Sequence, residues 1–170
     1  MTITRSHILV RTSSFGQEDM AIVGPLALQI LLSPKIELAR GHVSGVHDRA
    51  TATHNAVHHM FGHLARRSQY EKAPGGMVSL DIRLLRALLE LSRFYTYSIS
   101  ELAGGSHSKG SDHYRGRAFD VNVINGTRVS VTHPDYREFM NDCRQLGATL
   151  VLGPPQKDHA THVHAGWAAL

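Results

Sequence analysis

The amino-acid sequence predicts an α+β fold in which helices pack against a small, largely antiparallel sheet. In the second half of the chain the hydrophobic pattern changes in the order helix, strand, hairpin, helix, strand, strand. The hairpin is indicated by Asn125-Gly126 between two β-patterned runs, because a type I′ turn needs positive φ at both central residues. With 170 residues, the chain has the length of one domain and can bury a substantial core.

Residues 1–76 are predicted to form a partly helical N-terminal extension of a core at residues 77–170, within a single domain. The apolar run from Met20 to Leu32 is interrupted by Pro25 and is shorter than the roughly 20 residues that a membrane span needs. We therefore expect a buried helix or strand segment there, and no membrane span. The turn signal Pro74-Gly75-Gly76 marks the boundary between the two parts.

Residues Ala50 to Arg67 have the apolar periodicity of a helix. Two pairs of histidines, His54/His58 and His59/His63, are four residues apart on it, a spacing that can hold a metal ion. Because no glutamate completes a His-Glu-x-x-His motif, we interpret them as solvated or partly buried histidines of an amphipathic helix.

Local patterns predict the elements of the second half. A leucine stripe predicts a helix from Leu80 to about Arg93, with Ser79 as its N-cap. The later elements are a strand within Tyr95–Ser100, a flexible loop at Gly104–Gly110, hairpin strands at 118–123 and 127–131, a helix from Pro134 to Leu146, a strand at Thr149–Leu152 and a final histidine-rich strand.

Two distant segments contain residues typical of a metal site. His113 lies in the loop before the strand that carries Asp120, and His162 and His164 share one face of the last strand. If that strand lies beside the hairpin, His164 and Asp120 converge on one ion, with His162 next to it. Zinc that hydrolyses bonds is usually held by three nitrogen or oxygen ligands, which leaves a fourth position for a nucleophilic water.

The motif Ser111-x-His113-x-x-Gly116-x-Ala118-x-Asp120, followed further along by His162-x-His164, resembles the LAS superfamily of zinc peptidases. That group includes lysostaphin-type endopeptidases, D-Ala-D-Ala metallopeptidases and the N-terminal domain of sonic hedgehog. The resemblance covers about Leu80 to Trp167. It implies a hedgehog/D-Ala-D-Ala-peptidase-like fold and a zinc cofactor held by His113, Asp120 and His164. The implied activity is hydrolysis of peptide bonds in the stem or cross-bridge of peptidoglycan, by a D-Ala-D-Ala carboxypeptidase or a murein endopeptidase.

The general base is left open among three residues. Many peptidases of this group carry an acidic residue three positions before the last ligand, where this chain has Thr161. The resemblance to penicillin-insensitive murein endopeptidases points to His159 or His162, and the placement of the hedgehog glutamate points to Asp158. We place the histidines first because the unperturbed histidine pKa is already near working pH.

Three further residues are candidates for contact with substrate. Ser111 and Arg115 belong to the first motif, and His107 lies in the flexible loop before it. The alternative for Ser111 is a local role in shaping the turn, and the alternative for His107 is a bystander in a connecting loop.

Composition excludes several classes of protein. Cys143 is the only cysteine and lies on an apolar helical face, so we expect a core residue and neither a disulfide nor a cysteine nucleophile. The net charge of +4 suits an anionic partner such as bacterial cell wall. Basic residues are scattered and aromatic residues make up only 6%, so nucleic-acid binding is not expected. A non-catalytic, zinc-stabilised binding module of the hedgehog type remains the alternative to an enzyme.

The N-terminal run from Met1 to His7 lacks the basic and then apolar plan of a signal peptide. We therefore expect synthesis in the cytoplasm and action on the cell wall after release or delivery, as for a phage endolysin or an injected effector.

Overall fold

The computed structural model describes residues 17–170, so the run from Met1 to His7 lies outside the described residues. The elements in chain order are α1 (Gln17–Leu32), β1 (Ile36–Leu38), α2 (Ala52–Met60), β2 (Ala65–Arg66), β3 (Met77–Val78), α3 (Ile82–Leu91), β4 (Tyr97–Glu101), β5 (Ala118–Ile124), β6 (Thr127–Arg128), α4 (Tyr136–Gln145), β7 (Leu150–Leu152) and β8 (Val163–Gly166). This order and a mostly antiparallel sheet confirm the predicted α+β class.

The main sheet has β5 at its centre. Its strand order is β1-β4-β5-β8-β7, with β6 paired to the end of β5. Its pairs are antiparallel except β1 with β4, which run parallel. Because β5 has neighbours along both edges, a side chain on this strand has a rigid support.

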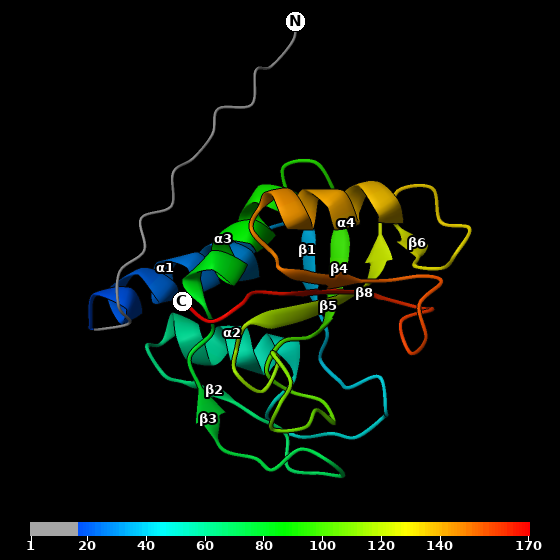
Figure 1. The fold of residues 1–170 in the computed structure, drawn as a ribbon. Helices are drawn as coiled ribbons and strands as arrows, with labels where there is room; N and C mark the ends of the chain where they lie inside the picture. The colour runs from blue at the N-terminus through cyan, green and yellow to red at the C-terminus, as the bar shows by residue number, and fades with distance from the viewer. Residues whose placement is uncertain (1–16) are drawn as a thin grey trace, which may run out of the picture.

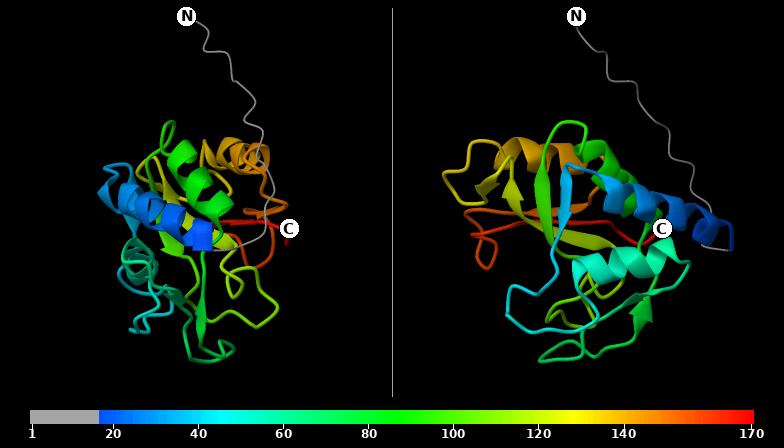
Figure 2. Two further views of the ribbon diagram at one scale, coloured as in Figure 1. Left: turned by 90° about the vertical axis from the view of Figure 1, so that its left-hand side faces the viewer. Right: turned by 180° about the vertical axis from the view of Figure 1, so that it is seen from behind.

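Helices lie on both sides of the main sheet (Figures 1 and 2). α3 and α4 lie on one side, whereas α2 and the two-stranded ribbon of β2 and β3 lie on the other. α1 packs against both α2 and α3. Among the described residues, no helix is long and apolar enough to cross a bilayer.

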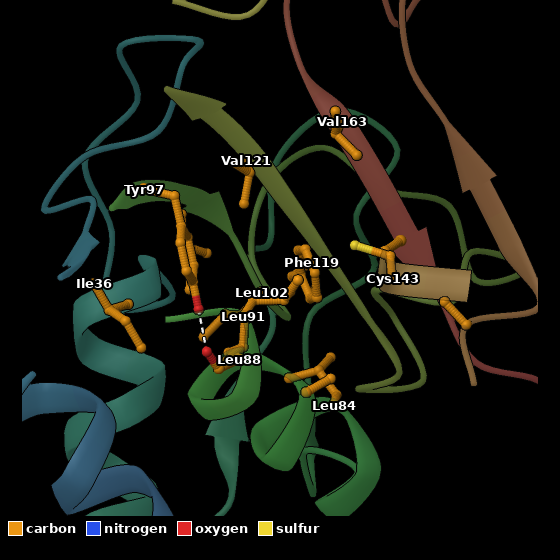
Figure 3. Close-up of a cluster of buried hydrophobic side chains, with 14 of the residues drawn as sticks. Ile36, Leu84, Leu88, Leu91, Tyr97, Leu102, Phe119, Val121, Cys143 and Val163 are labelled. Atoms are coloured by element: carbon orange, nitrogen blue, oxygen red, sulfur yellow. Dashed lines mark hydrogen bonds between the residues drawn. The ribbon is translucent and has the colours of Figure 1, made fainter. Parts of the chain in front are cut away.

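The core lies between the sheet and the helices α3 and α4. Figure 3 shows Leu84, Leu88 and Leu91 of α3 packed near Phe119 and Val121 of β5. Tyr97 is buried among them, and its hydroxyl donates to the backbone carbonyl of Leu88. Since Phe119 and Val121 point into this core, Asp120 between them points to the opposite face of the sheet.

Cys143 is fully buried in the same core, as the sequence predicted. Burial raises the pKa of its thiol far above the ordinary value, so the thiolate form of Cys143 is not populated.

The predicted hairpin is confirmed. β5 and β6 are joined at Asn125 and Gly126, whose φ angles are 49° and 76°. The second strand is shorter than predicted and ends at Arg128. The chain then turns towards α4, and a hydrogen bond from the His133 N–H to the Ser130 carbonyl closes this turn.

Two helix boundaries in the sequence analysis were wrong. The helix predicted for Ala50 to Arg67 is α2, which ends at Met60, and the chain enters β2 at Ala65. The N-cap of α3 is Asp81, whose carboxylate accepts from the Arg83 N–H, and not Ser79. The Leu80 N–H, which precedes this cap, donates to the His59 ring nitrogen Nε2.

The first part of the chain contributes a strand to the main sheet. β1 pairs with β4 in parallel register, with Ile36 opposite Tyr97 and Leu38 opposite Ile99. A three-residue strand is too short to show a periodic pattern, which is why the sequence did not reveal it. Its position brings the segment that follows it, residues 39–51, close to the end of β4.

Candidate metal centre

Two of the predicted ligands are cross-strand neighbours. Asp120 of β5 and His164 of β8 are directly paired in the antiparallel ladder, so their side chains leave the same face of the sheet next to each other. Both are buried, with 7% of each residue exposed. The strand pairing therefore brings the two distant segments together.

His113 reaches this pair from the loop between β4 and β5. Its Nδ1–H donates to the backbone carbonyl of Leu102, at 2.5 Å, so Nε2 is the ring nitrogen that faces the other two side chains. Gly116, the glycine of the motif, allows the loop to approach the chain before α3. It has a φ of 70°, and a Cβ atom there would lie 2.2 Å from the Ser79 carbonyl oxygen. A larger residue would push the loop that carries His113 away from the sheet.

The three side chains converge on one point. The His164 Nδ1 lies 2.9 Å from the Asp120 Oδ1 and 3.1 Å from the His113 Nε2. The remaining distance, from the His113 Nε2 to the Asp120 Oδ1, is 3.2 Å. Ligand atoms on one tetrahedral zinc ion are about 3.3 Å apart, given bonds of about 2.0 Å. The triangle thus has nearly the dimensions of three ligands around a single small cation.

The electrostatics favour a carboxylate within this triangle. Burial alone would raise the pKa of Asp120, but the adjacent His113 and His164 hold it well below its ordinary value. Burial acts to lower the pKa of His113, but the negative charge of Asp120 outweighs the effect of burial, and the pKa of His113 is raised overall. The site holds one anionic oxygen and two nitrogens, the donor set of an N/O zinc site.

His107 is also brought to the site. His107, His113 and Asp120 offer ligand atoms that lie within 4.8 Å of one another, so this group could hold a metal ion. The His107 Nε2 is buried and has no hydrogen-bond partner. Burial lowers the pKa of His107 to about 3, which leaves the ring neutral at neutral pH.

The orientation of the rings distinguishes His107 from His164 as a ligand. An imidazole binds a metal in the plane of the ring, along the nitrogen lone pair. The His107 and His113 rings are stacked, 3.9 Å apart and within 10° of parallel, so both cannot direct in-plane lone pairs at one ion. The His113 and His164 rings are 4.9 Å apart and inclined by 58°, close to the separation of about 5 Å for two imidazoles on one tetrahedral ion. This geometry favours His113, Asp120 and His164 as ligands, with His107 beside them.

The candidate bases lie at different distances from the triangle. The His162 Nε2 is 4.0 Å from the Asp120 Oδ1, and its side chain is 24% exposed. The His159 ring is 4.9 Å from that of His162 and 5.9 Å from that of His164. The His159 Nδ1–H donates to the Lys157 carbonyl, so its Nε2 is an acceptor. Asp158 is exposed, and its φ is 63°. His162 is therefore nearest to the triangle.

Ser111 and Arg115 contact neighbouring parts of their own loop. The Ser111 hydroxyl accepts from the His113 N–H at 3.2 Å, which is the local role considered for it. The Arg115 side chain is 52% exposed, and its guanidinium lies 3.8 Å from the Asp112 carboxylate.

A buried charged cluster next to the site was not predicted. The Nδ1 of His42 lies 2.9 Å from both carboxylate oxygens of Glu101, and its Nε2 lies 2.7 Å from the Asp48 Oδ1. Glu101 is paired with Asp120 across the sheet. Burial lowers the pKa of His42, but its hydrogen bonds to Glu101 and Asp48 outweigh this and raise the pKa to about 9. His42 and Glu101 are 59 residues apart, so no local pattern could link them.

The histidines of α2 have local roles. The His59 ring is fully buried, and its Nε2 accepts from the Leu80 N–H at 2.8 Å. The Nδ1 of His54 lies 2.9 Å from the Thr51 hydroxyl, and the Nδ1–H of His58 donates to the Leu64 carbonyl. His54 is exposed and His58 is partly buried, as expected for solvated or partly buried histidines of an amphipathic helix, whereas His59 is fully buried.

No protein-family model, curated protein or solved structure matches the chain. Any assignment of function therefore depends on the chemistry of the site and on the motif that carries it.

Proposed function

We propose that the protein is a zinc-dependent peptidase that hydrolyses peptide bonds of peptidoglycan. The observation that carries this proposal is the triangle of His113 Nε2, Asp120 Oδ1 and His164 Nδ1, with sides of 2.9–3.2 Å. The motif resemblance to LAS peptidases supports it, and so does the α+β sheet that holds the site. A hedgehog/D-Ala-D-Ala-peptidase-like topology is part of the same proposal.

The donor set fits zinc better than the hard divalent cations. Calcium and magnesium prefer oxygen ligands, whereas zinc accepts imidazole nitrogens together with a carboxylate. The bond from the His113 Nδ1–H to the Leu102 carbonyl supports this assignment, because it holds His113 in the tautomer with Nε2 available. Zinc at this site would polarise a substrate carbonyl and lower the pKa of a water.

We assign the proton transfers to His162, with His159 and Asp158 as the other candidates. His162 lies nearest to the triangle and is partly exposed, so it can reach a water beside the ligands. It would accept a proton from the attacking water and deliver it to the leaving amine. The water oxygen bonds to the carbonyl carbon, and the carbon–nitrogen bond of the peptide breaks.

His107 is proposed to bind the substrate carbonyl. Its Nε2 is buried and unpartnered, and one of its ring nitrogens lies within 4.8 Å of the His113 and Asp120 ligand atoms. A neutral imidazole with a protonated Nε2 can donate to the oxygen on which negative charge develops. Ser111 and Arg115 would then act by holding the loop next to this oxygen.

Peptidoglycan as the substrate rests on the motif resemblance and on the net charge of +4, which suits an anionic polymer. Delivery to the wall by a phage lysis route or by an injection apparatus belongs to the same proposal.

A non-catalytic, zinc-stabilised module is the second candidate, and the position of His107 favours it. If the His107 ring left its stack on His113 and turned its Nε2 to the ion, four protein ligands would close the coordination sphere. Structural zinc sites are closed in this way, whereas catalytic sites keep one position open.

Digestion of purified muropeptides, followed by product masses, tests the proposal. The wild-type chain should release two products whose masses together exceed that of the substrate by one water, and the bond cut follows from the fragment masses. Chelator-treated protein and His164→Ala should be inactive. His63→Ala is the matched control, because His63 is an exposed histidine outside the site and should keep full activity. A zinc-loaded wild type that leaves all muropeptides intact would favour the binding module.

A further inference from the structure

Side chains from the first part of the chain make hydrogen bonds to the segment that precedes the His113 loop, residues 101–105. Residues 101–105 begin with the last residue of β4, carry the Leu102 carbonyl that receives the His113 Nδ1–H, and lead to His107. Within residues 17–76, three side chains make hydrogen bonds to this segment: His42, Asn55 and Ser68. All three are buried, with at most 6% of each residue exposed.

Each of these residues holds a different point of the segment. Both Glu101 oxygens lie 2.9 Å from the His42 Nδ1. The Ala103 N–H donates to the Asn55 Oδ1 at 2.9 Å, and the Gly105 N–H donates to the Ser68 Oγ at 3.0 Å. The bound positions are 101, 103 and 105, so they bracket the Leu102 carbonyl on both sides.

The His42 cluster, which consists of His42, Asp48 and Glu101, is held in place by further hydrogen bonds. Its two ring nitrogens face carboxylates of Glu101 and Asp48, so both nitrogens donate and the ring is an imidazolium. Ser68 contacts the same ring at 3.3 Å and so joins the His42 cluster to Gly105. The chain also packs tightly here, since a Cβ atom on Gly104 would lie 2.1 Å from the Ala50 carbonyl oxygen.

We propose that His42, Asn55 and Ser68 are positioning residues for the metal centre: by holding residues 101–105 they place the Leu102 carbonyl, which keeps the His113 Nε2 free for the metal. This inference rests on the proposed zinc site. It assigns a role to the first part of the chain, which sequence analysis left without one. Outer partners of this kind typically change metal affinity about 10–100-fold when they are removed.

Two variants and one control test it. Ser68→Ala removes the hydroxyl that holds Gly105, and His42→Gln removes the cation that holds Glu101. Thr53→Val is the matched control, because the Thr53 hydroxyl donates to the Leu38 and Ala39 carbonyls in the same part of the chain and makes no hydrogen bond to residues 101–105. Thermal midpoints of the metal-free proteins, measured in parallel, report the general loss of stability.

The first readout is the zinc dissociation constant from chelator competition, together with the visible spectrum of the cobalt-substituted protein. Ser68→Ala and His42→Gln should weaken zinc binding by about 10-fold or more and alter the cobalt spectrum, while Thr53→Val stays within about twofold of wild type. Equal weakening in all three variants, in proportion to their thermal midpoints, would overturn the proposal. So would unchanged affinity in both test variants.

The second readout is the tautomer of the neutral His113 ring in the metal-free protein at alkaline pH, from imidazole nitrogen chemical shifts. Wild type and Thr53→Val should carry the proton on Nδ1, and the test variants should populate the Nε2–H form. Retention of the Nδ1–H form in both test variants would contradict the inference. Because this readout needs neither zinc nor substrate, a failure of the peptidase proposal would leave its result intact.

Discussion

Asp120 is the anionic member of the ligand triangle, and its charge matters more than its shape. Asp120→Asn preserves the size of the side chain but removes the charge and one strong donor oxygen. We expect zinc affinity to fall by more than about 100-fold, beyond the usual effect of an outer-shell partner. Chelator competition measures this loss. A zinc affinity within tenfold of wild type would exclude Asp120 as a ligand. The control is Asp135→Asn, which changes a carboxylate at the N-cap of α4 and should leave zinc binding unchanged.

Whether His107 binds the metal determines whether the ion keeps an open coordination position or is closed by four protein ligands. In His107→Phe the aromatic stack on His113 is kept and the ring nitrogens are lost. If His107 binds the substrate carbonyl, the zinc dissociation constant should stay near the wild-type value while kcat falls about 10²–10³-fold. Isothermal titration and muropeptide kinetics separate these effects. A large loss of zinc affinity would instead indicate four protein ligands and a structural metal.

At the scale of elements, a buried histidine joins α2 to the start of α3. His59 is fully buried, and burial lowers its pKa to about 4 from an ordinary value of 6.5. Between these two pH values the unfolded chain binds the proton and the folded chain does not. Stability should therefore be highest above pH 6.5 and fall as the pH is lowered towards 4.

The variant His59→Gln tests this dependence, because an amide oxygen can still accept from the Leu80 N–H but does not titrate. Urea unfolding at pH 7 and pH 5 should show a steeper loss of stability for wild type than for the variant. Between pH 6.5 and pH 4 the contribution of His59 to the change in the free energy of unfolding is about 3 kcal/mol at most, given 1.36 kcal/mol per pKa unit. Identical pH profiles would show that His59 becomes protonated without cost in the folded state.

Strand pairing and turn chemistry contribute to the site in different ways. The antiparallel register of β5 with β8 places Asp120 opposite His164, and the turn at Gly116 delivers His113 to them. A shift of one residue in this register would turn the His164 side chain to the core face of the sheet. The metal centre therefore depends on the same register that buries Phe119 and Val163.

At the scale of the molecule, metal binding and folding are linked, because the triangle is assembled from segments that meet only in the folded chain. A ligand at 100 times its dissociation constant stabilises by about 2.7 kcal/mol. For a chain of this size that corresponds to a rise in thermal midpoint of about 5–10 °C. Differential scanning calorimetry with zinc should show this rise, magnesium should not produce it, and Asp120→Asn should lose it. No shift with zinc in wild type would argue against the metal centre.

Much of the molecule followed from residues that are close in sequence. The α+β class, the Asn125-Gly126 turn and the buried Cys143 were predicted from local patterns, and the candidate ligands His113, Asp120 and His164 from the motif resemblance. Periodicity and turn chemistry act over a few residues, so a single sequence displays them. The N-cap of α3 was predicted wrongly because Ser79 and Asp81 are both residue types that cap helices, and only the folded chain shows that the Asp81 carboxylate accepts from the Arg83 N–H.

The tertiary structure alone decided the rest. The parallel pairing of β1 with β4, the stack of His107 on His113 and the charged pair of His42 with Glu101 each join segments that no pattern relates. The orientation of a ring or the partner of a buried charge depends on packing around it, and packing is a property of the whole chain. The sequence determined which groups are available for metal chemistry, and the fold determined which of them point at the same place.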